Sequence, residues 1–188
     1  MTRVCLIGSP EVDLRYELLS RETSREALSS YDLERPFENT IEIRTVSIGA
    51  AVSILNDLQW YLVRFVEEAI VLEPSVSGEE WLSRKLATAI RNSRIEPEES
   101  DEFLKLYGVE SGSRPAAAPS GPATDGPEGS GTQSKRTDES NPATTHAGPD
   151  RLVEPLYVRR TDGEVPTYDL RDVDDTLVVR LTEGEFTP

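Results

Sequence analysis

Hydrophobic residues recur at helical spacing along the longest apolar part of the chain, residues 49–72. Seven of them share one stripe of a helical projection, at alternating intervals of four and three residues: Ala51, Leu55, Leu58, Leu62, Phe65, Ala69 and Leu72. Further apolar residues flank this stripe on both sides, so the apolar arc is wider than a coiled-coil seam requires. The pattern predicts one long central helix that is buried on several sides.

The polar face of the same segment argues against a membrane span. It carries Asp57, Arg64, Glu67 and Glu68, and four charges would be costly in the core of a bilayer. The apolar run at the N-terminus is too short for a signal peptide. We therefore expect a cytoplasmic protein that does not associate with membranes.

Two strands are predicted before the central helix. Residues 3–8 are a run of β-branched and aliphatic side chains, and residues 40–47 alternate apolar and polar ones. Between them, residues 9–11 (Ser-Pro-Glu) are typical of a helix start. Residues 12–29 then fit a helix, although residues 12–20 also alternate like a strand; we favour the helix. The order strand, helix, strand, helix indicates a right-handed crossover and a partly parallel sheet.

Two more helices are predicted after the central one. Residues 77–80 (Ser-Gly-Glu-Glu) form a capping box ahead of a helix whose inner residues include Trp81 and Leu86. Pro97 begins another helix, which ends at Gly108. Residues 1–110 are therefore expected to form one α/β module.

The last third of the chain changes character twice. Residues 111–149 contain no Val, Ile, Leu, Met, Phe, Tyr or Trp, which predicts a disordered linker. Residues 150–188 then predict a three-stranded antiparallel meander from segments 152–160, 165–170 and 176–182. Because so short a domain seldom folds alone, we expect the meander to dock on the module, in cis or in trans.

These elements together predict an α/β fold, with α+β as the alternative. The expected architecture is a small, partly parallel sheet with a long central helix, two further helices and the C-terminal meander.

The charge balance is strongly acidic. There are 35 acidic and 20 basic residues, a net charge of −15, and only three of the basic residues are lysine. Acid excess with scarce lysine is typical of proteins that work in molar salt, where counter-ions screen the repulsion between carboxylates. No basic block offers a phosphate track, so we expect no binding to nucleic acid.

Little in the sequence indicates catalysis. Cys5 is the only cysteine and lies in an apolar run, where a buried, unreactive thiol is expected. The only histidine, His146, lies in the predicted linker, so we expect neither a histidine-based catalytic site nor a metal site. Asp57, Glu67 and Glu68 could act as acids or bases, but carboxylates on an exposed helix face usually serve solvation. We expect no cofactor, and an enzyme is the less favoured reading.

Two sets of residues are candidates for binding. Gly8, Ser9 and Ser47 should lie at the carboxyl ends of two strands and at helix starts, where anionic ligands bind free N–H groups, although simple capping would also explain them. Trp60 projects into the polar face of the central helix, and Arg64, one turn later, could stack on its ring. An indole among charges is either covered by the chain or offered to a partner.

Three stretches carry a family resemblance: DLRYELLSRETSREALSSYDLERPFENT, DLQWYLVRFVEEA and EEWLSRKLA. They resemble a family of uncharacterised haloarchaeal proteins over the first 110 residues and, in part, the C-terminal segment. The resemblance implies a halophilic source and an intact fold, but no activity and no site residues.

We therefore expect a non-enzymatic interaction or regulatory module whose partner is a protein, either a second copy or another chain. The alternative is a protein that binds a small molecule or nucleotide at a site near Ser9 and Ser47. This alternative includes an enzyme. A pocket with converging arginines at the strand ends would favour the alternative, and an exposed surface around Trp60 would favour the interaction module.

Overall fold

The structure is a computed structural model that describes residues 1–112, 148–161, 163–166, 173 and 175–186. Most of the predicted linker, with His146, lies outside the described residues, and so does most of the predicted return strand 165–170.

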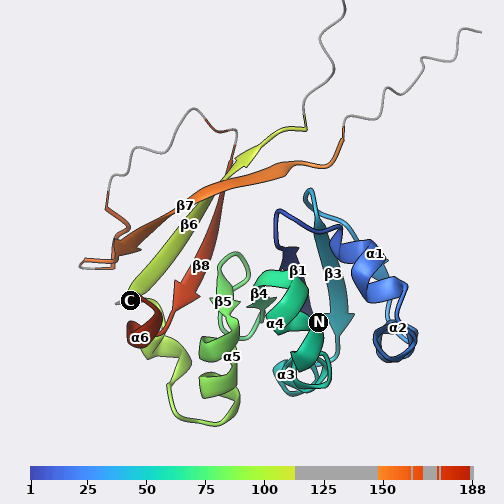
Figure 1. The fold of residues 1–188 in the computed structure, drawn as a ribbon. Coiled ribbons are helices and arrows are strands. Elements are labelled where there is room, and N and C mark those ends of the chain that lie inside the picture. Colours follow the sequence, from blue (N-terminus) through green and yellow to red (C-terminus); the bar gives the residue numbers. More distant parts are fainter. Residues whose placement is uncertain (113–147, 162, 167–172, 174, 187–188) are drawn as a thin grey trace, which may run out of the picture.

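Within the described residues the chain forms eight strands and six α-helices (Figure 1). The first half contains β1 (Thr2–Gly8), α1 (Leu14–Leu19), α2 (Glu22–Leu28), β2 (Leu33–Glu34), β3 (Thr40–Thr45), α3 (Ile48–Asp57), α4 (Gln59–Phe65) and β4 (Val66–Leu72). The second half contains β5 (Trp81–Ser83), α5 (Arg84–Arg91), the 3₁₀ turn Pro97–Glu99, β6 (Phe103–Glu110), β7 (Arg151–Arg159), β8 (Asp175–Leu181) and α6 (Glu183–Phe186).

All eight described strands belong to one open, mixed sheet with the order β2-β3-β1-β4-β5-β8-β6-β7. The predicted mixed α/β content is therefore confirmed, in a form close to α+β. The predicted parallel pairing of the first two long strands is wrong, because β1 and β3 are antiparallel, with Ile7 opposite Thr40. The segment between them leaves β1 and enters β3 at the same end of the sheet, so it does not cross over to the other end. Among the described pairs only β5 and β8 are parallel.

The two faces of the sheet bury different cores. Successive side chains of a strand point to opposite faces, so Val4 and Leu6 of β1 pack under the helices, in a cluster with residues of α1 to α5. Cys5 and Ile7 face the other way. Their cluster contains residues of β4, β5, β6 and β8, and no helix residue. The predicted burial of Cys5 is confirmed, and burial raises the pKa of its thiol to about 12.

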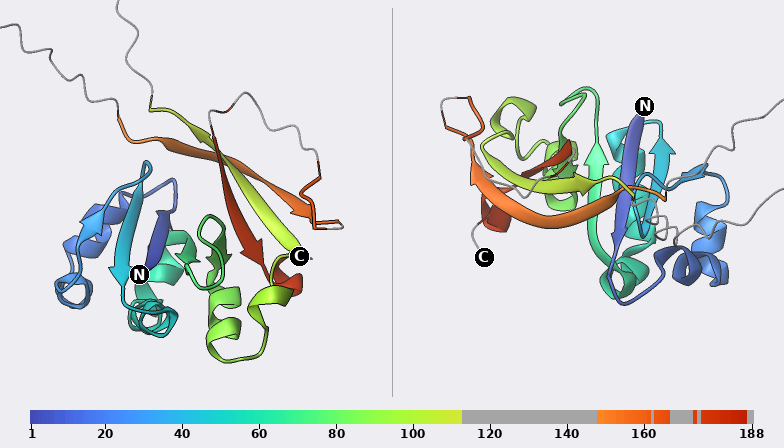
Figure 2. Two further views of the ribbon diagram at one scale, coloured as in Figure 1. Left: turned by 180° about the vertical axis from the view of Figure 1, so that it is seen from behind. Right: turned by 90° about the horizontal axis from the view of Figure 1, so that it is seen from above.

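The second face is covered because the sheet bends back on itself. β6 and β7 lean across the end of the sheet, and β7 begins beside the loop that precedes β3 (Figures 1 and 2). There the Glu38 N–H donates a 2.7 Å hydrogen bond to the Asp150 carbonyl. β6 lies between β7 and β8, so the two C-terminal strands each pair with β6 and not with one another as a meander would.

Ion pairs reinforce this second half of the sheet. Glu80, in the loop before β5, bonds to Arg160 after β7 at 2.6 Å and to Arg180 of β8 at 2.5 Å. Burial alone would raise the pKa of Glu80, but the hydrogen bonds and charges of these two arginines outweigh it and lower that pKa.

The predicted central helix is correct only in its first part. Leu58 ends α3 and starts α4, and from Val66 the chain becomes the strand β4. β4 lies between β1 and β5, so Ala69 to Leu72 is buried on both faces. A short apolar run of this kind fits a buried strand as well as a helix, and sheet pairing decided the outcome.

The predicted helix starts are shifted for identifiable reasons. Residues 9–12 form a loop, in which the Ser9 and Val12 carbonyls accept hydrogen bonds from the Asn39 side chain. The helix α1 therefore starts later than predicted, with Asp13 as its N-cap. Ser77 bonds to Glu80 N–H in a turn, and Ser83 is the N-cap of α5. The helix predicted from Pro97 is one 3₁₀ turn followed by β6.

In the part of the chain that the structure describes, no helix has both the length and the apolar character that a membrane crossing requires.

Candidate functional site

Three residues form an exposed aromatic and basic surface on the helical side of the molecule: Arg21, Trp60 and Arg64. We call this the Trp60 surface. The Trp60 side chain is 53% exposed, and Tyr16, on the neighbouring helix α1, is 68% exposed. The Arg64 guanidinium carbon lies 4.9 Å from the centre of the Trp60 ring, which confirms the predicted stacking. From the turn between α1 and α2, the guanidinium of Arg21 approaches the same ring at 5.7 Å.

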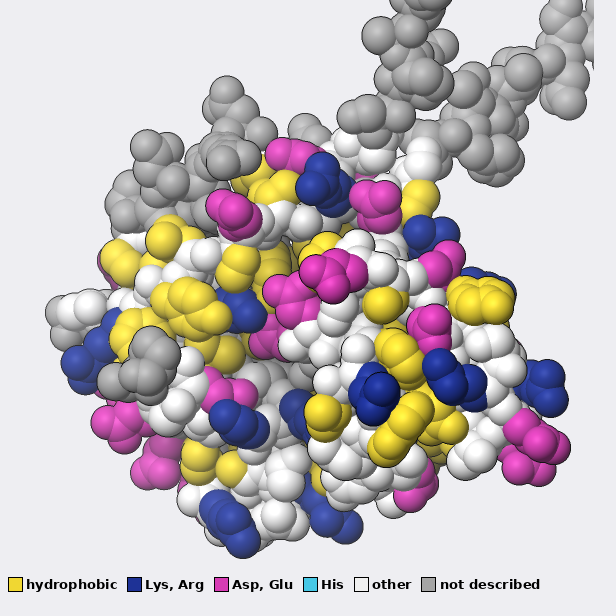
Figure 3. Space-filling model, viewed as in Figure 1, with side chains coloured by type: hydrophobic (Ala, Val, Ile, Leu, Met, Phe, Trp, Pro, Cys, Tyr) yellow, Lys and Arg dark blue, Asp and Glu magenta, His cyan; other side chains and the backbone are white. Residues whose placement is uncertain are grey.

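The two arginines differ in how they are neutralised. Arg21 forms a 2.9 Å ion pair with Glu17, one helical turn away. For Arg64, no carboxylate of the described residues lies within ion-pair distance, so its N–H donors face solvent. Hydrophobic and basic side chains lie next to one another over α4 in Figure 3. The surface thus combines an open aromatic face with unpaired hydrogen-bond donors.

The other candidate residues, Gly8, Ser9 and Ser47, are not brought together. Because β1 and β3 are antiparallel, Gly8 and Ser47 lie at opposite ends of these strands. The N–H groups of Gly8 and Ser9 already donate to the carbonyls of Asn39 and Phe65, at 2.9 and 3.0 Å. Ser47 caps α3 by accepting from the Ala50 N–H. The geometry on which an anion site at these residues depended is therefore absent.

Gly8 has a packing role that explains its presence. A Cβ atom built there would lie 2.6 Å from the Asn39 side chain and 2.8 Å from Leu14 Cβ. The glycine lets Asn39 approach β1 closely and hold the loop that leads into α1.

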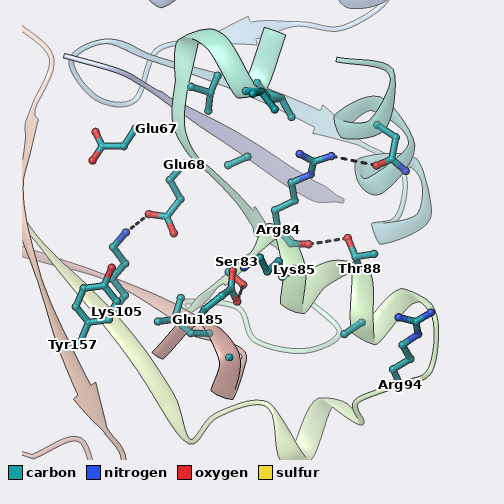
Figure 4. Close-up of a pocket in the computed structure, with 18 residues that line it drawn as sticks. Glu67, Glu68, Ser83, Arg84, Lys85, Thr88, Arg94, Lys105, Tyr157 and Glu185 are labelled. Atoms are coloured by element: carbon teal, nitrogen blue, oxygen red, sulfur yellow. Dashed lines mark hydrogen bonds and ion pairs between the residues drawn. The ribbon is translucent and has the colours of Figure 1, made fainter. Parts of the chain in front are cut away.

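A cleft of about 810 Å³ opens between β4 and α5, and its lining includes Glu67 and Glu68, two of the three carboxylates that the sequence offered as acids or bases. Figure 4 shows its labelled residues on three sides. Glu67 and Glu68 come from β4, and Lys105 and Tyr157 come from β6 and β7. The helix α5 and its flanks contribute Ser83, Arg84, Lys85, Thr88 and Arg94, and α6 contributes Glu185.

Four residues at one end of the cleft form what we call the Lys105 cluster: Glu68, Lys105, Tyr107 and Tyr157. The Lys105 ammonium lies 2.6 Å from Glu68 Oε2, and both side chains are nearly buried, at 12% and 15% exposure. The same ammonium lies 4.9 and 5.6 Å from the ring centres of Tyr107 and Tyr157. The Tyr107 hydroxyl donates to the same Glu68 oxygen. Burial, followed by the Glu68 charge, raises the pKa of Tyr107.

On the α5 side of the cleft, Arg84 forms hydrogen bonds to uncharged groups. Arg84 donates to the Leu55 carbonyl at 3.3 Å and to the side chains of Asn56 and Gln59, which ties α5 to the end of α3. Burial without a carboxylate partner lowers the pKa of Arg84. In Figure 4 its guanidinium points away from Glu68.

Ser83 and Glu185 interlock the starts of two helices. Ser83 Oγ accepts from the Leu86 N–H to cap α5, and donates at 2.6 Å to Glu185 Oε2. The same carboxylate oxygen accepts from the N–H and hydroxyl of Thr182, and the first of these bonds is one half of a capping box at the start of α6. Helix capping therefore explains the positions of the Ser83 hydroxyl and the Glu185 carboxylate without a bound ligand.

The described residues that line the cleft form no arrangement typical of covalent catalysis. Among the described residues, no group of three or more His, Cys, Asp or Glu side chains could hold a metal ion. The described charges of β4 and α5 form no ion pair with one another across the cleft.

The sequence missed the Lys105 cluster for a definite reason. Glu68 and Lys105 are both in segments that were predicted as helices, and neither was expected to face the inside of a sheet. The alternation Glu68, Ile70, Leu72 was the available signal, since it matches the inward face of β4.

Comparison with known proteins adds a family and no activity. No curated protein matches the chain, and no solved structure matches it. The model of a family of unknown function, DUF5804, matches residues 2–109. Since this is more than half of the sequence, the chain belongs to that family.

Proposed function

We propose that this protein is a non-enzymatic interaction module that binds an acidic segment of a partner protein through the Trp60 surface. One observation carries the proposal: Arg64 stacks on a half-exposed tryptophan while its hydrogen-bond donors have no carboxylate partner among the described residues.

The residue types of the surface support a protein partner. Trp, Tyr and Arg are the residues most enriched where binding energy concentrates in protein interfaces. An indole ring offers a large, rigid contact area, and ordering it costs little conformational entropy. The stacked guanidinium is already oriented, so it can donate two parallel hydrogen bonds to an incoming carboxylate.

The charge of the surface supports an acidic partner. The chain carries a net charge of −15, whereas this surface presents Arg21 and Arg64, with Arg15 on the neighbouring α1. Glu17 pairs with Arg21, whereas no carboxylate of the described residues pairs with Arg64. Complementary charge would select acidic segments and disfavour nucleic acids.

The proposal includes a cytoplasmic setting in a halophilic organism. Acid excess with scarce lysine supports it, as does the resemblance to haloarchaeal sequences. In such a setting most partner proteins are themselves acidic, and direct Arg–carboxylate contacts at a desolvated ring are screened less than exposed ones.

Site-specific crosslinking tests the proposal. A photoreactive p-benzoylphenylalanine in place of Tyr16 would be introduced into the full chain and activated in the native host, and the crosslinked segment identified by mass spectrometry. We expect crosslinks to an acidic segment of one protein, and their loss when Arg64→Glu or Trp60→Ala is added.

Arg91→Glu is the matched control, because it makes the same charge change on exposed α5. It should leave the crosslink in place. Crosslinks that persist in both Trp60→Ala and Arg64→Glu, or that map to basic segments, would refute the proposal.

A further inference from the structure

The cleft between β4 and α5 has the dimensions of a small-molecule site. Its volume of about 810 Å³ lies within the roughly 300–1,000 Å³ of known ligand pockets. None of the three residues of the Trp60 surface lines it, so its occupation is separate from the protein docking proposed above.

The two main walls of the cleft carry opposite charges. Glu67 and Glu68 of β4 stand on one side, where Lys105 neutralises Glu68. Arg84 and Lys85 of α5 stand on the other, with Arg94 just after α5 (Figure 4). Apolar side chains, including those of Leu62, Val66 and Leu181, line the space as well.

These charges do not neutralise each other across the cleft. Glu68 pairs with Lys105 through Oε2, and no hydrogen bond of a described residue reaches its other oxygen. Arg84 bonds to neutral groups of α3 and of the α4 start. Within the described part of the chain, Glu67 and Lys85 form no ion pair. Each wall therefore keeps binding capacity of its own sign.

The start of α5 strengthens the cationic wall. Ser83 Oγ occupies the Leu86 N–H, whereas the N–H groups of Arg84 and Lys85 lie in the first turn, where a helix leaves its donors free. The helix dipole adds partial positive charge there. Glu185 lies close by, but its Oε2 is held by Ser83 and Thr182, while Lys85 forms no ion pair with a described residue.

We propose that this cleft binds a small zwitterion, a molecule with an ammonium group and a carboxylate joined by an apolar spacer. The ammonium binds at Glu67 and the free oxygen of Glu68. The carboxylate binds at Lys85 and the first turn of α5. A simple anion would face the two glutamates, and a simple amine would face Arg84 and Lys85, so each meets repulsion that the zwitterion avoids.

Titration calorimetry on the full chain tests this with glycine, 4-aminobutyrate and 6-aminohexanoate as probes of increasing spacer length. The single-charge analogues are acetate and methylamine for glycine, butyrate and butylamine for 4-aminobutyrate, and hexanoate and hexylamine for 6-aminohexanoate. We expect at least one zwitterion to bind about tenfold or more tightly than both of its analogues. If every zwitterion binds more weakly than about 10 mM, or if an analogue binds equally well, the proposal is wrong.

Two single variants separate the ends of the ligand. Glu67→Gln should weaken binding of the best zwitterion about tenfold and leave its carboxylate analogue unaffected or slightly improved. Lys85→Met should weaken both the zwitterion and that analogue. Arg91→Met, also an exposed cation of α5 but outside the cleft, should bind like the wild type. Unchanged zwitterion binding in both Glu67→Gln and Lys85→Met would overturn the assignment. Both positions are exposed, so circular dichroism should show an unchanged fold.

Discussion

The Lys105 cluster and the Trp60 surface are built from the same kinds of side chain but differ in what completes them. In both, a cation lies about 5 Å from an aromatic ring. Lys105 is nearly buried, and Glu68 neutralises it at 2.6 Å. Arg64 lies over a half-exposed Trp60, and no carboxylate of the described residues completes its charge.

We infer that the carboxylate, and not the cation–π contact, separates a structural cluster from the proposed binding surface. A cation enclosed by protein must be paired, because an unpaired buried charge costs several kcal/mol. A cation at the surface can remain unpaired at little cost, and its donors stay available to a partner. Removing side chains from the two regions should therefore affect different properties.

Glu68→Gln should produce the largest loss of stability. It leaves the Lys105 ammonium, 12% exposed, without a counter-charge between two tyrosine rings. We expect the free energy of unfolding to fall by about 3 kcal/mol, the lower part of the range for breaking a buried ion pair. Urea denaturation measures this. Glu67→Gln, its exposed neighbour, should cost less than about 0.5 kcal/mol, and equal losses would mean that the pairing does not matter.

Tyr107→Phe should produce a smaller loss that disappears at high pH. Losing the hydrogen bond to Glu68 should cost about 1.5 kcal/mol at neutral pH. The folded-state pKa of Tyr107 is raised, so its stabilising effect is full below the ordinary tyrosine pKa of about 10. Above that pH the unfolded chain releases the proton first, and the wild type loses stability that the Phe variant keeps.

Unfolding measured from pH 8 to pH 11 in both proteins checks this. The difference between wild type and Tyr107→Phe should shrink above about pH 10, and a constant difference would show that Tyr107 titrates normally.

Added salt should raise the stability of the whole molecule more than it changes the contribution of the Lys105 cluster. With a net charge of −15, we expect the melting temperature to rise steadily from about 0.1 M to 3 M KCl, as screening relieves repulsion. The cost of Glu68→Gln should change by less than about 1 kcal/mol over the same range, because buried pairs are screened less. A melting temperature independent of salt would contradict the halophilic setting.

How far the sequence predicted this molecule differs between local and long-range features. The apolar run at β1, the alternation in β3 and the cap at Ser47 were readable, because neighbouring residues determine them. Trp60 and Arg64 are one helical turn apart, so their stacking was readable too.

Features that depend on distant residues were not readable. Val66–Leu72 became a strand because β1 and β5 flank it, and the sequence pattern within the segment does not encode those neighbours. The antiparallel pairing of β1 with β3 removed the expected site at Gly8, Ser9 and Ser47. Glu68 and Lys105 are joined only by the bend of the sheet, so the cleft could not be foreseen.

Two variants that each remove one cation test the account most directly. Arg64→Ala tests whether the Trp60 surface binds a partner, and Lys105→Met tests whether the Lys105 cluster stabilises the fold. Each variant, with the Tyr16 crosslinker, would be compared with the wild type for unfolding free energy and for crosslinked partner. We expect Arg64→Ala to change stability by less than about 0.5 kcal/mol and to abolish the crosslink. Lys105→Met should lower stability by about 2 kcal/mol or more and keep the crosslink at temperatures where it is folded. The opposite pattern, a destabilised Arg64→Ala that still crosslinks, would contradict the assignment of the two regions.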